Sequence, residues 1–329
     1  MKSHDLPHVP AFAKLRGAQV LITGGAGFIG SHLARRATAL GAEVRILDDL
    51  SGGFLENLAG IDYEFFEGSV EDAGLVERAS QDVDYVFHEA AMVSVPESVE
   101  RPSRCYSINN LGCQNVLESA GRARAKRVVL ASSAAAYGQT PSLPSKEGDL
   151  ADCWSPYAAS KVAAELMSQA WGRVSGLSSV NLRYFNVYGP RQNPNSAYAA
   201  VISAFAKALI SGVQPAIFGD GSQTRDFTHV DNVVLANFLA ATHETTFMGE
   251  VFNVGLGRRT SLLELLGAMC RTLGKDVAPA FGPLRAGDVA HSCADISRAR
   301  GALGYAPCVD FETGLKDTLA DFQLRYAGA

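Results

Sequence analysis

A glycine-rich turn between an apolar run and a helical pattern constrains the fold of this chain more than any other feature of its sequence. Residues 19–22 form an apolar run of strand length, and Gly24, Gly27 and Gly30 follow with the spacing G-x-x-G-x-x-G. Apolar and small residues then recur at helical spacing from residue 28 to residue 40. Such a turn lets the backbone and the positive end of the helix approach a pyrophosphate. It therefore predicts a strand–helix unit with a dinucleotide site.

An acidic residue stands at the end of the next predicted strand, residues 44–47. Asp48 follows that strand and lies 18 residues after Gly30. A carboxylate at this place accepts hydrogen bonds from the adenosine ribose hydroxyls and repels a 2′-phosphate, so it favours NAD over NADP. The alternative is a polar residue that only ends a strand.

Strands and helices continue to alternate through the first half of the chain. Helical patterns cover residues 103–123 and 155–173. Further strands are predicted at residues 63–66, 85–88, 127–132 and 179–184. This alternation predicts a Rossmann-like α/β fold, a doubly wound parallel sheet with helices on both faces.

The second half is less regular. Turn-rich segments separate a strand at residues 251–254 from the predicted helices near residues 199–211, 230–242, 261–273 and 311–326. We expect an NAD-binding domain over residues 1–186, beginning with an arm at residues 1–18. A smaller, mainly substrate-binding domain over residues 187–329 is expected to pack with it as one unit.

Composition excludes several kinds of partner. The 29 basic and 34 acidic residues give a net charge of −5, and no block of like charges predicts binding to nucleic acid or to an anionic membrane. No apolar run is long enough to cross a membrane, and the first 19 residues lack the apolar block of a secretory signal, so a cytoplasmic protein is expected. The cysteines lack metal-ligand spacing and predict small, reduced, buried side chains and no metal site: 105, 113, 153, 270, 293 and 308.

A tyrosine and a lysine are placed for proton transfer. Tyr157 and Lys161 lie four residues apart on a predicted helix, hence on one face. A phenol titrates near pH 10, but a lysine about 4 Å away contributes roughly 4 kcal/mol at an effective dielectric of 20, or about three pKa units. The pair is therefore expected to transfer protons near pH 7. Alone, this spacing is more often a surface helix pattern; Ser133 and the glycine turn upstream favour a catalytic site.

The segments TGGAGFIG, FHEAA, SSAAAYG, YAASK and LRYFNVYGPR, in this order, resemble the extended short-chain dehydrogenase/reductase family, and within it the nucleotide-sugar epimerases. The resemblance runs from about residue 19 to the C-terminus. It implies an NAD-dependent enzyme that epimerises a UDP-sugar at carbon 4 through a transient 4-keto sugar. Tyr157 would be the acid/base, Lys161 would hold the nicotinamide ribose, and Ser133 would bind the reacting hydroxyl.

The resemblance also implies the other ligand contacts. Cofactor contacts would come from Gly24, Gly27, Phe28, Ile29, Gly30, Asp48, Asp49, Ser51, Gly53, Ser69, Val70, Ala90, Ala91, Asn109, Ser132, Tyr157, Lys161 and Tyr184. Substrate contacts would come from Ser94, Ser133, Asn186, Ala200, Val201, Phe218, Arg225, Arg285, Asp288 and Ser292. Ser69 departs from the family, which usually has an aspartate near the adenine, so that contact is lost or replaced by the hydroxyl.

Two alanines narrow the reaction. The family's 4,6-dehydratases need an acid and a base where this chain has Ala134 and Ala135, and methyl groups cannot transfer protons. Ala135 also stands where the UDP-glucuronate decarboxylases carry a glutamate. A 4-epimerase remains. Ser292 replaces a tyrosine of members restricted to plain hexoses and leaves room for an N-acetyl group, as in UDP-N-acetylglucosamine. UDP-glucose and UDP-uronic acids are compatible with the same residues.

Two other classes stay open. A net oxidoreductase, such as a keto-sugar reductase, would release its cofactor in each cycle. A non-catalytic NAD-binding sensor should have lost Tyr157 or Lys161, and this chain keeps both. The helices at residues 103–123 and 155–173 resemble those that pair across the family's dimer interface, so a homodimer is expected on that analogy.

Overall fold

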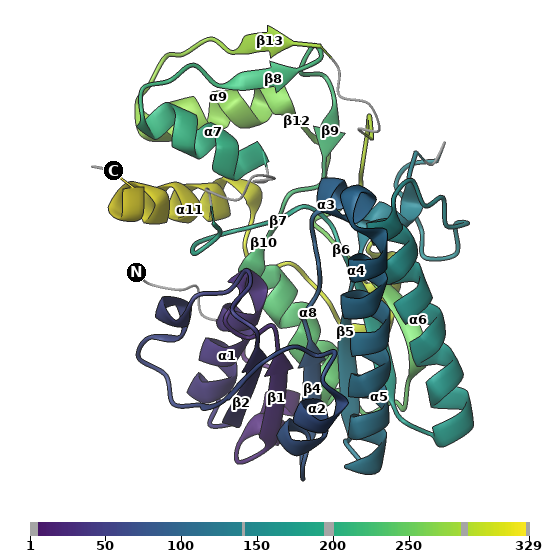
Figure 1. Ribbon diagram of the computed structural model, residues 1–329. Coiled ribbons are helices and arrows are strands. Elements are labelled where there is room, and N and C mark those ends of the chain that lie inside the picture. Colours follow the sequence, from purple (N-terminus) through teal and green to yellow (C-terminus); the bar gives the residue numbers. More distant parts are fainter. Residues whose placement is uncertain (1–5, 140–141, 194–200, 284–288, 327–329) are drawn as a thin grey trace.

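A parallel sheet of seven strands forms the centre of the molecule (Figure 1). The computed structural model describes residues 6–139, 142–193, 201–283 and 289–326. The strand order is β11-β6-β5-β4-β1-β2-β3, and every neighbouring pair is parallel. The strands are β1 (Gln19–Thr23), β2 (Glu43–Asp48), β3 (Glu64–Glu67), β4 (Tyr85–His88), β5 (Arg127–Ser133), β6 (Ser179–Tyr184) and β11 (Met248–Val254). The predicted doubly wound sheet is confirmed.

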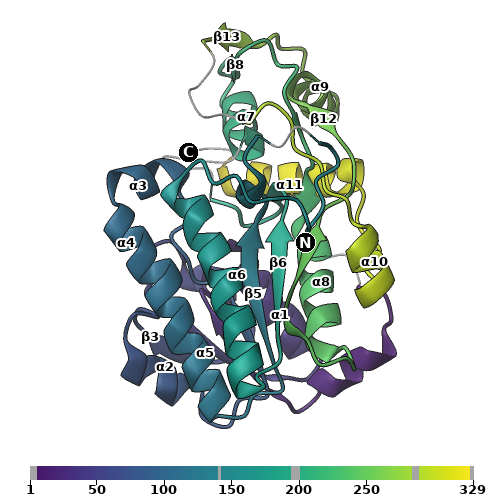
Figure 2. The same ribbon diagram turned by 90° about the vertical axis from the view of Figure 1, so that its right-hand side faces the viewer.

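Helices cover both faces of this sheet (Figure 2). One face carries α1 (Phe28–Ala39), α8 (Val230–Thr242) and α10 (Ser297–Leu303). The other carries α2 (Ala73–Ala79), α5 (Gly112–Arg122) and α6 (Pro156–Ser175). Val20 and Ile22 pack into the core under α1 and α8, whereas Leu21 packs into the core under α5. Strand β1 carries a continuous apolar run because both of its faces are buried.

The predicted helix at residues 103–123 is interrupted. Its parts are α4 (Pro102–Tyr106), a π-helical segment at Ser107–Leu111 and α5, and the short helix α3 (Val95–Glu100) precedes them. A π-turn inserts one residue into an otherwise helical pattern, so the periodicity of the sequence did not reveal it.

A smaller lobe lies over the carboxyl ends of β4, β5 and β6 (Figure 1). Its helices α7 (Val201–Ile210), α9 (Leu262–Leu273) and α11 (Phe311–Tyr326) share one apolar core. Three strand pairs complete it: β7 (Val187–Tyr188) with β10 (Thr228–His229), β9 (Thr224–Arg225) with β12 (Thr260–Ser261), and β8 (Ala216–Phe218) with β13 (Ala280–Gly282).

The chain crosses between the two parts more than once. Both α8 and β11 follow residue 186, yet β11 is an edge strand of the large sheet and all of α8 is buried against it. Sequence order alone did not show which unit these elements complete. The division at residue 186 stays a prediction.

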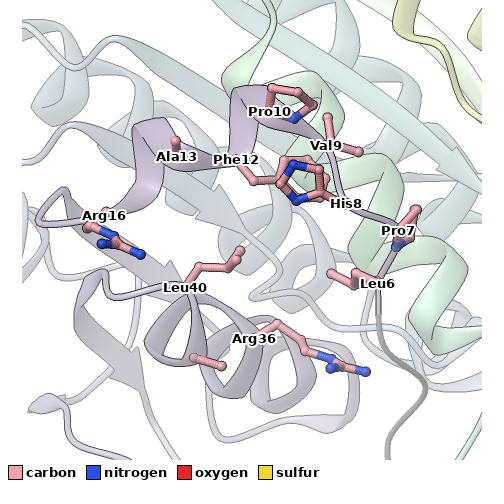
Figure 3. A pocket seen from close by; sticks show the side chains of 11 residues that line it. Leu6, Pro7, His8, Val9, Pro10, Phe12, Ala13, Arg16, Arg36 and Leu40 are labelled. Atoms are coloured by element: carbon pink, nitrogen blue, oxygen red, sulfur yellow. The ribbon is translucent and has the colours of Figure 1, made fainter.

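The N-terminal arm packs on the large unit. A 3-10 helix at Pro10–Leu15 places Phe12 edge-on against Phe238 of α8, with 5.8 Å between ring centres. A cavity of about 480 Å³ lies between the arm and α1, lined by Leu6, His8 and Arg36 among others (Figure 3). None of the predicted site residues lines this cavity.

The cysteines, the helix lengths and the possible metal ligands were also subjects of prediction. Four cysteines are buried, but Cys153 and Cys308 are exposed, so the expectation of uniformly buried thiols is wrong for these two, which lie in surface segments. None of the helices in the described ranges is long and apolar enough to cross a membrane. Over those same ranges, no cluster of three or more His, Cys, Asp or Glu side chains is arranged to hold a metal ion.

Candidate active site

The carboxyl ends of four neighbouring strands meet at one edge of the sheet. Gly24 follows β1, Glu89 follows β4, and Ser133 and Tyr184 end β5 and β6. The chain leaves β1 towards β2 on one side and later reaches β4 on the other, which makes β1 and β4 the point where the strand order reverses. Open α/β sheets bind ligands at such a point.

The glycine turn is as tight as its spacing predicts. Gly24 has a left-handed φ of +69°, and a Cβ there would lie 2.7 Å from the backbone nitrogen of Ala90. A Cβ on Gly30 would overlap the carbonyl oxygen of Gly24. Gly27 differs, because its Cβ would meet only that oxygen, at 3.1 Å. Gly24 and Gly30 let the turn pack closely against the end of β4 and the start of α1. Gly27 leaves the outer side of the turn open.

The open side of the turn suits a dinucleotide. No side chain caps the N-terminus of α1, so its first N–H groups and its positive end are left for an anion, with Phe28 and Ile29 in the first turn. Buried Asp48 accepts hydrogen bonds from the backbone nitrogens of Ala26 at 2.9 Å and Leu50 at 2.8 Å. These bonds orient the carboxylate beside the turn, and each oxygen keeps a lone pair for a ribose hydroxyl. Burial raises the pKa of Asp48, while the two backbone bonds oppose that rise.

Further predicted cofactor contacts lie in two loops at the ends of β2 and β3. Asp49 accepts a hydrogen bond from the backbone nitrogen of Ser51 at 3.0 Å, and Gly53 lies against Ala26 of the glycine turn. The hydroxyl of Ser69 donates to Glu71 at 3.0 Å. It is therefore engaged within its own loop.

Helix α6 presents the proton-transfer pair to the sheet. Ser155 caps the helix by accepting from the backbone nitrogen of Ala158 at 3.1 Å. Tyr157 and Lys161 follow on one face, and the Tyr157 phenol is hydrogen-bonded to Ser133 at the end of β5. Lys161 is buried and donates to the carbonyl oxygen of Ala131 at 2.9 Å. The structure thus brings the three predicted catalytic residues together.

The expected effect of Lys161 on Tyr157 is corrected by this geometry. Burial raises the pKa of Tyr157 above its ordinary value, and the hydrogen bond with Ser133 only partly offsets that rise. The Lys161 ammonium lies 6.0 Å from the centre of the tyrosine ring and binds a backbone carbonyl instead. Burial also lowers the pKa of Lys161 itself. In the polypeptide alone, Lys161 therefore does not lower the pKa of Tyr157 toward 7.

Asn109 clamps the loop after β4 to the catalytic helix. Its side chain accepts from the backbone nitrogen of Met92 at 2.8 Å and donates to its carbonyl oxygen at 3.1 Å. The same amide donates to the hydroxyl of Ser160 at 2.8 Å. Asn109 lies in the π-helical segment, which is how one side chain reaches both partners. The clamp also fixes the loop containing the predicted backbone contacts Ala90 and Ala91. Another buried side chain, Val70, packs against the start of α5.

Glu89 is a site residue that the motif analysis missed. The hydroxyl of Tyr184 donates to its carboxylate at 2.7 Å and accepts from Asn237 of α8 at 2.9 Å. Burial raises the pKa of Glu89 to about 7. Its neighbour His88 is held neutral, because burial lowers its pKa to about 3. The available signal was a lone carboxylate directly after an apolar strand.

A second missed group anchors α6. Glu165, one turn beyond Lys161, accepts two hydrogen bonds from Arg183 of β6, both at 2.8 Å. Both side chains are buried. Ser132, predicted as a cofactor contact, uses its hydroxyl to bind Glu165.

The predicted substrate residues come from both parts of the molecule. The backbone nitrogen of Ser292 donates to Thr224 at 3.0 Å, which places Ser292 beside Arg225 of β9. Arg225 donates to the carbonyl oxygens of Thr224 at 3.0 Å and Ala290 at 3.3 Å. Asn186 follows β6 with a φ of +27°, a strained value typical of functional loops.

Three more of these residues are described at the ends of elements. Ser94 caps α3 by accepting from the backbone nitrogen of Glu97 at 3.1 Å. Phe218 ends β8 and Val201 begins α7. The predicted substrate contacts Ala200, Arg285 and Asp288 lie outside the described residues.

Comparison with known proteins agrees with this geometry. Residues 20–255 match the NAD dependent epimerase/dehydratase family. This chain belongs to that family. It is 39% identical over 311 residues to the UDP-glucose 4-epimerase of Mycolicibacterium smegmatis, an alignment covering 93% of this chain and 98% of the relative.

Solved structures of family members are also similar. The UDP-N-acetylglucosamine 4-epimerase from Methanobrevibacter ruminantium M1, in complex with UDP-N-acetylmuramic acid, superposes with a TM-score of 0.90 at 38% identity, covering 94% of this chain and 99% of that one. The UDP-glucose 4-epimerase of Thermotoga maritima with UDP-glucose gives a TM-score of 0.89 at 38% identity, covering 93% and 99%. The family member described here is thus an NAD-dependent enzyme of the nucleotide-sugar 4-epimerase type, as its motifs predicted.

Proposed function

We propose that this enzyme interconverts UDP-N-acetylglucosamine and UDP-N-acetylgalactosamine, and that it also accepts UDP-glucose and UDP-galactose. The observation that carries the proposal is the Tyr157 phenol, hydrogen-bonded to Ser133 across from the glycine turn. That arrangement suits the removal and return of one hydroxyl proton beside a dinucleotide. The relatives that act on UDP-glucose and UDP-N-acetylglucosamine support the substrate class.

The side chains have separate tasks in the reaction. Tyr157 takes the proton of the sugar's 4-hydroxyl, while Ser133 holds that oxygen in place. NAD, held by the glycine turn and Asp48, would supply the oxidation and the later reduction of carbon 4 by hydride transfer. The resulting 4-keto sugar turns over in the pocket, so that carbon 4 regains its hydrogen on the other face, and Tyr157 returns its proton to the oxygen at carbon 4. The buried charge of Lys161 favours the tyrosinate.

The segment after Ser133 restricts the outcome to epimerisation. Ala134 and Ala135 begin a 3-10 helix at Ala134–Tyr137, directly beside the proposed reacting hydroxyl. Neither side chain carries a proton, so elimination of water from the keto sugar has no acid or base at these positions. Return of the hydrogen to carbon 4 is the remaining path.

The N-acetyl preference rests on Ser292. This small side chain is half-buried and lies beside Arg225, whose guanidinium suits phosphate oxygens. A serine leaves space that a tyrosine would fill, and an acetamido group at carbon 2 would occupy that space. The Methanobrevibacter relative, solved with an N-acetyl sugar nucleotide, supports this assignment.

Proton NMR of the anomeric region tests the proposal. Purified protein, without added cofactor, is incubated with UDP-N-acetylglucosamine, and signals of UDP-N-acetylgalactosamine are expected to appear. Conversion without added NAD supports an epimerase that regenerates its cofactor rather than a net reductase. If UDP-N-acetylglucosamine, UDP-glucose and UDP-glucuronate all stay unchanged after NAD is supplied, the proposed function is wrong.

The variant Ser292→Tyr tests the specificity. Tyrosine should fill the acetamido space and lower kcat/KM for UDP-N-acetylglucosamine by about 10- to 100-fold, with UDP-glucose turnover retained. The control Ser292→Ala should keep both activities. Equal losses on both sugars in Ser292→Tyr would contradict the assignment.

We also propose a homodimer formed through the helices at residues 103–123 and 155–173, which are α4 with α5, and α6, together with the neighbouring α3. Apolar side chains are exposed on these segments: Val99 of α3 (62%), Leu111 at the end of the π-helical segment (49%) and Leu166 of α6 (60%). Helices α3 and α4 pack against each other and against α6, which lies on the sheet (Figure 2). Apolar side chains that gather on one outer face favour a protein–protein interface.

A further inference from the structure

Glu89 is a carboxylate at the centre of the site that the proton-transfer scheme does not use. It directly follows β4, and its backbone nitrogen donates to Thr23 of β1 at 3.1 Å. Its carbonyl carbon would lie 3.0 Å from a Cβ on Gly24. Glu89 is therefore fixed between the glycine turn and the strands that carry the proton-transfer residues.

Neutral groups hold the Glu89 side chain. Tyr184 donates to Oε1 at 2.7 Å, and Asn237 donates to the Tyr184 oxygen at 2.9 Å. Over the residues that the structure describes, Glu89 forms no ion pair with a lysine or arginine. The hydrogen bonds orient the carboxylate and leave its charge available to a more distant cation.

Lys161 is that cation. It is buried, and its ammonium donates to one carbonyl oxygen, that of Ala131. His88 of β4 pairs with Leu130 of β5, so Glu89 follows at the level of Ala131, whose carbonyl oxygen binds Lys161. Glu165, from the same helix as Lys161, is the other carboxylate whose charge acts on it. Glu165 is committed to Arg183 through two hydrogen bonds at 2.8 Å, so its charge is already balanced. The carboxylate left for Lys161 is Glu89.

Several other titratable groups lie around Glu89 and Lys161. Cys105 and Cys113 face Lys161, and burial raises the pKa of the Cys113 thiol to about 12. Burial raises the pKa values of Tyr157 and Tyr184 and lowers that of His88 to about 3. The charge balance of Lys161 therefore depends on Glu89.

We propose that Glu89 is a positioning residue that acts through Lys161: its carboxylate balances the buried ammonium, so that Lys161 stays charged while Tyr157 exchanges its proton with the sugar. This rests on the proposed function, in which Tyr157 is the acid/base. Replacing Glu89 by a neutral side chain should make Lys161 lose its proton at a lower pH. The tyrosinate would then lose its nearby positive charge.

Titration of Lys161 in the cofactor-free protein tests the proposal without any substrate. The chain has eight lysines, so 13Cε-lysine labelling gives a spectrum in which Lys161 is assigned by its loss in Lys161→Met. In Glu89→Gln, which keeps the shape and the hydrogen-bond acceptor, the pKa of Lys161 should fall by about one unit. Glu89→Asp, which keeps the charge, should restore most of the wild-type value.

Glu244→Gln is the matched control, because it removes one exposed carboxylate that pairs with Lys14. The pKa of Lys161 should be unchanged in this variant. If Glu89→Gln also leaves it unchanged, the proposal is overturned. If Glu89→Gln does not fold, the titration is done on Glu89→Asp. In that variant, a wild-type pKa of Lys161 together with lost activity would mean that the role of Glu89 is structural. That result would overturn the proposal.

Epimerisation kinetics provide the second readout. Glu89→Gln should move the alkaline limb of the kcat profile about one unit lower, which lowers kcat by about tenfold at a pH on that limb, and should leave KM for the UDP-sugar unchanged. A rise in KM with an unmoved alkaline limb would contradict the proposal. If the wild-type enzyme epimerises none of the sugars, the proposed function fails, and the lysine titration still decides whether Glu89 balances Lys161.

Discussion

Tyr157 and Lys161 lie one helical turn apart, but different neighbours control their protonation. Burial raises the pKa of Tyr157 and lowers that of Lys161, so desolvation favours the neutral form of both side chains. The hydrogen bond from Ser133 and the charge of Glu89 act against these effects, one on each residue. The protonation states of Tyr157 and Lys161 therefore depend on the surrounding residues and not on the spacing of the two residues alone.

Removal of the phenol should abolish chemistry without unfolding the protein. Tyr157→Phe loses the group that takes and returns the hydroxyl proton, so kcat should fall by about 10³-fold while NAD remains bound. The NMR epimerisation assay measures kcat, and absorbance of the purified protein reports the cofactor. Tyr63→Phe, outside the site, is the control. A decrease of less than about tenfold would exclude Tyr157 as the acid/base.

Glu89 should also make stability depend on pH. Its pKa is about 7 in the folded state and 4.5 is its ordinary value, so between these pH values the folded protein holds a proton that the unfolded chain has lost. Stability from this group is therefore lost as the pH rises through this range. Relative to wild type, Glu89→Gln should gain about 1.4 kcal/mol in unfolding free energy per pH unit there. Urea unfolding of the cofactor-free proteins measures the difference, and parallel pH profiles would contradict it.

At the scale of elements, helix α6 fixes the site through three consecutive turns. Tyr157, Lys161 and Glu165 lie at i, i+4 and i+8, which places them on one face toward the sheet. They reach Ser133 and Ala131 of β5 and Arg183 of β6. Because Glu165 binds Arg183 with both oxygens, the helix cannot slide along the sheet without breaking this buried pair.

Breaking the buried pair should cost far more than breaking an exposed one. Glu165→Gln leaves the Arg183 guanidinium buried without its counter-charge and should lower the unfolding free energy by about 3 kcal/mol. Glu118→Gln, which removes one of the two exposed carboxylates that pair with Arg122 of α5, should cost less than about 1 kcal/mol. Urea denaturation compares the two. Equal losses would mean that the pair does not anchor α6.

At the scale of the whole molecule, the site lies between two units with separate cores. In the proposed site, the large unit would supply the glycine turn, Asp48 and the proton-transfer residues, and the smaller lobe would supply Arg225 and Ser292. On the outer side of the sheet, apolar side chains of α3 and α6 remain exposed. A dimer formed there would leave the lobe free.

One substitution on that outer face should separate the subunits. Leu166→Glu places a charge on α6 at the centre of the proposed interface, so the protein should elute as a monomer where wild type is a dimer. Light scattering during size-exclusion chromatography measures the mass. Leu324→Glu, on the exposed side of α11, is the control and should leave the mass unchanged. A monomeric wild-type protein would contradict the proposed dimer.

Much of the fold could be predicted from local patterns. Strands β4 and β6 have the predicted bounds, and helix α8 begins and ends where its pattern does. Two features could not be predicted locally. The π-helical segment around Asn109 interrupts a continuous helical pattern, and β11 joins the large sheet from beyond the expected boundary. Both depend on which distant segments pack together.

The sequence by itself determined the strand–helix order, the glycine turn, the positions of Ser133, Tyr157 and Lys161, and membership of the family. These follow from residue type and from spacing within one element. Only the tertiary structure decided the charges in the site. Glu89 meets Tyr184 across 95 residues of chain, and its effect on Lys161 depends on burial that several elements create together. Desolvation and Coulomb energies depend on distances in space, which no local pattern records.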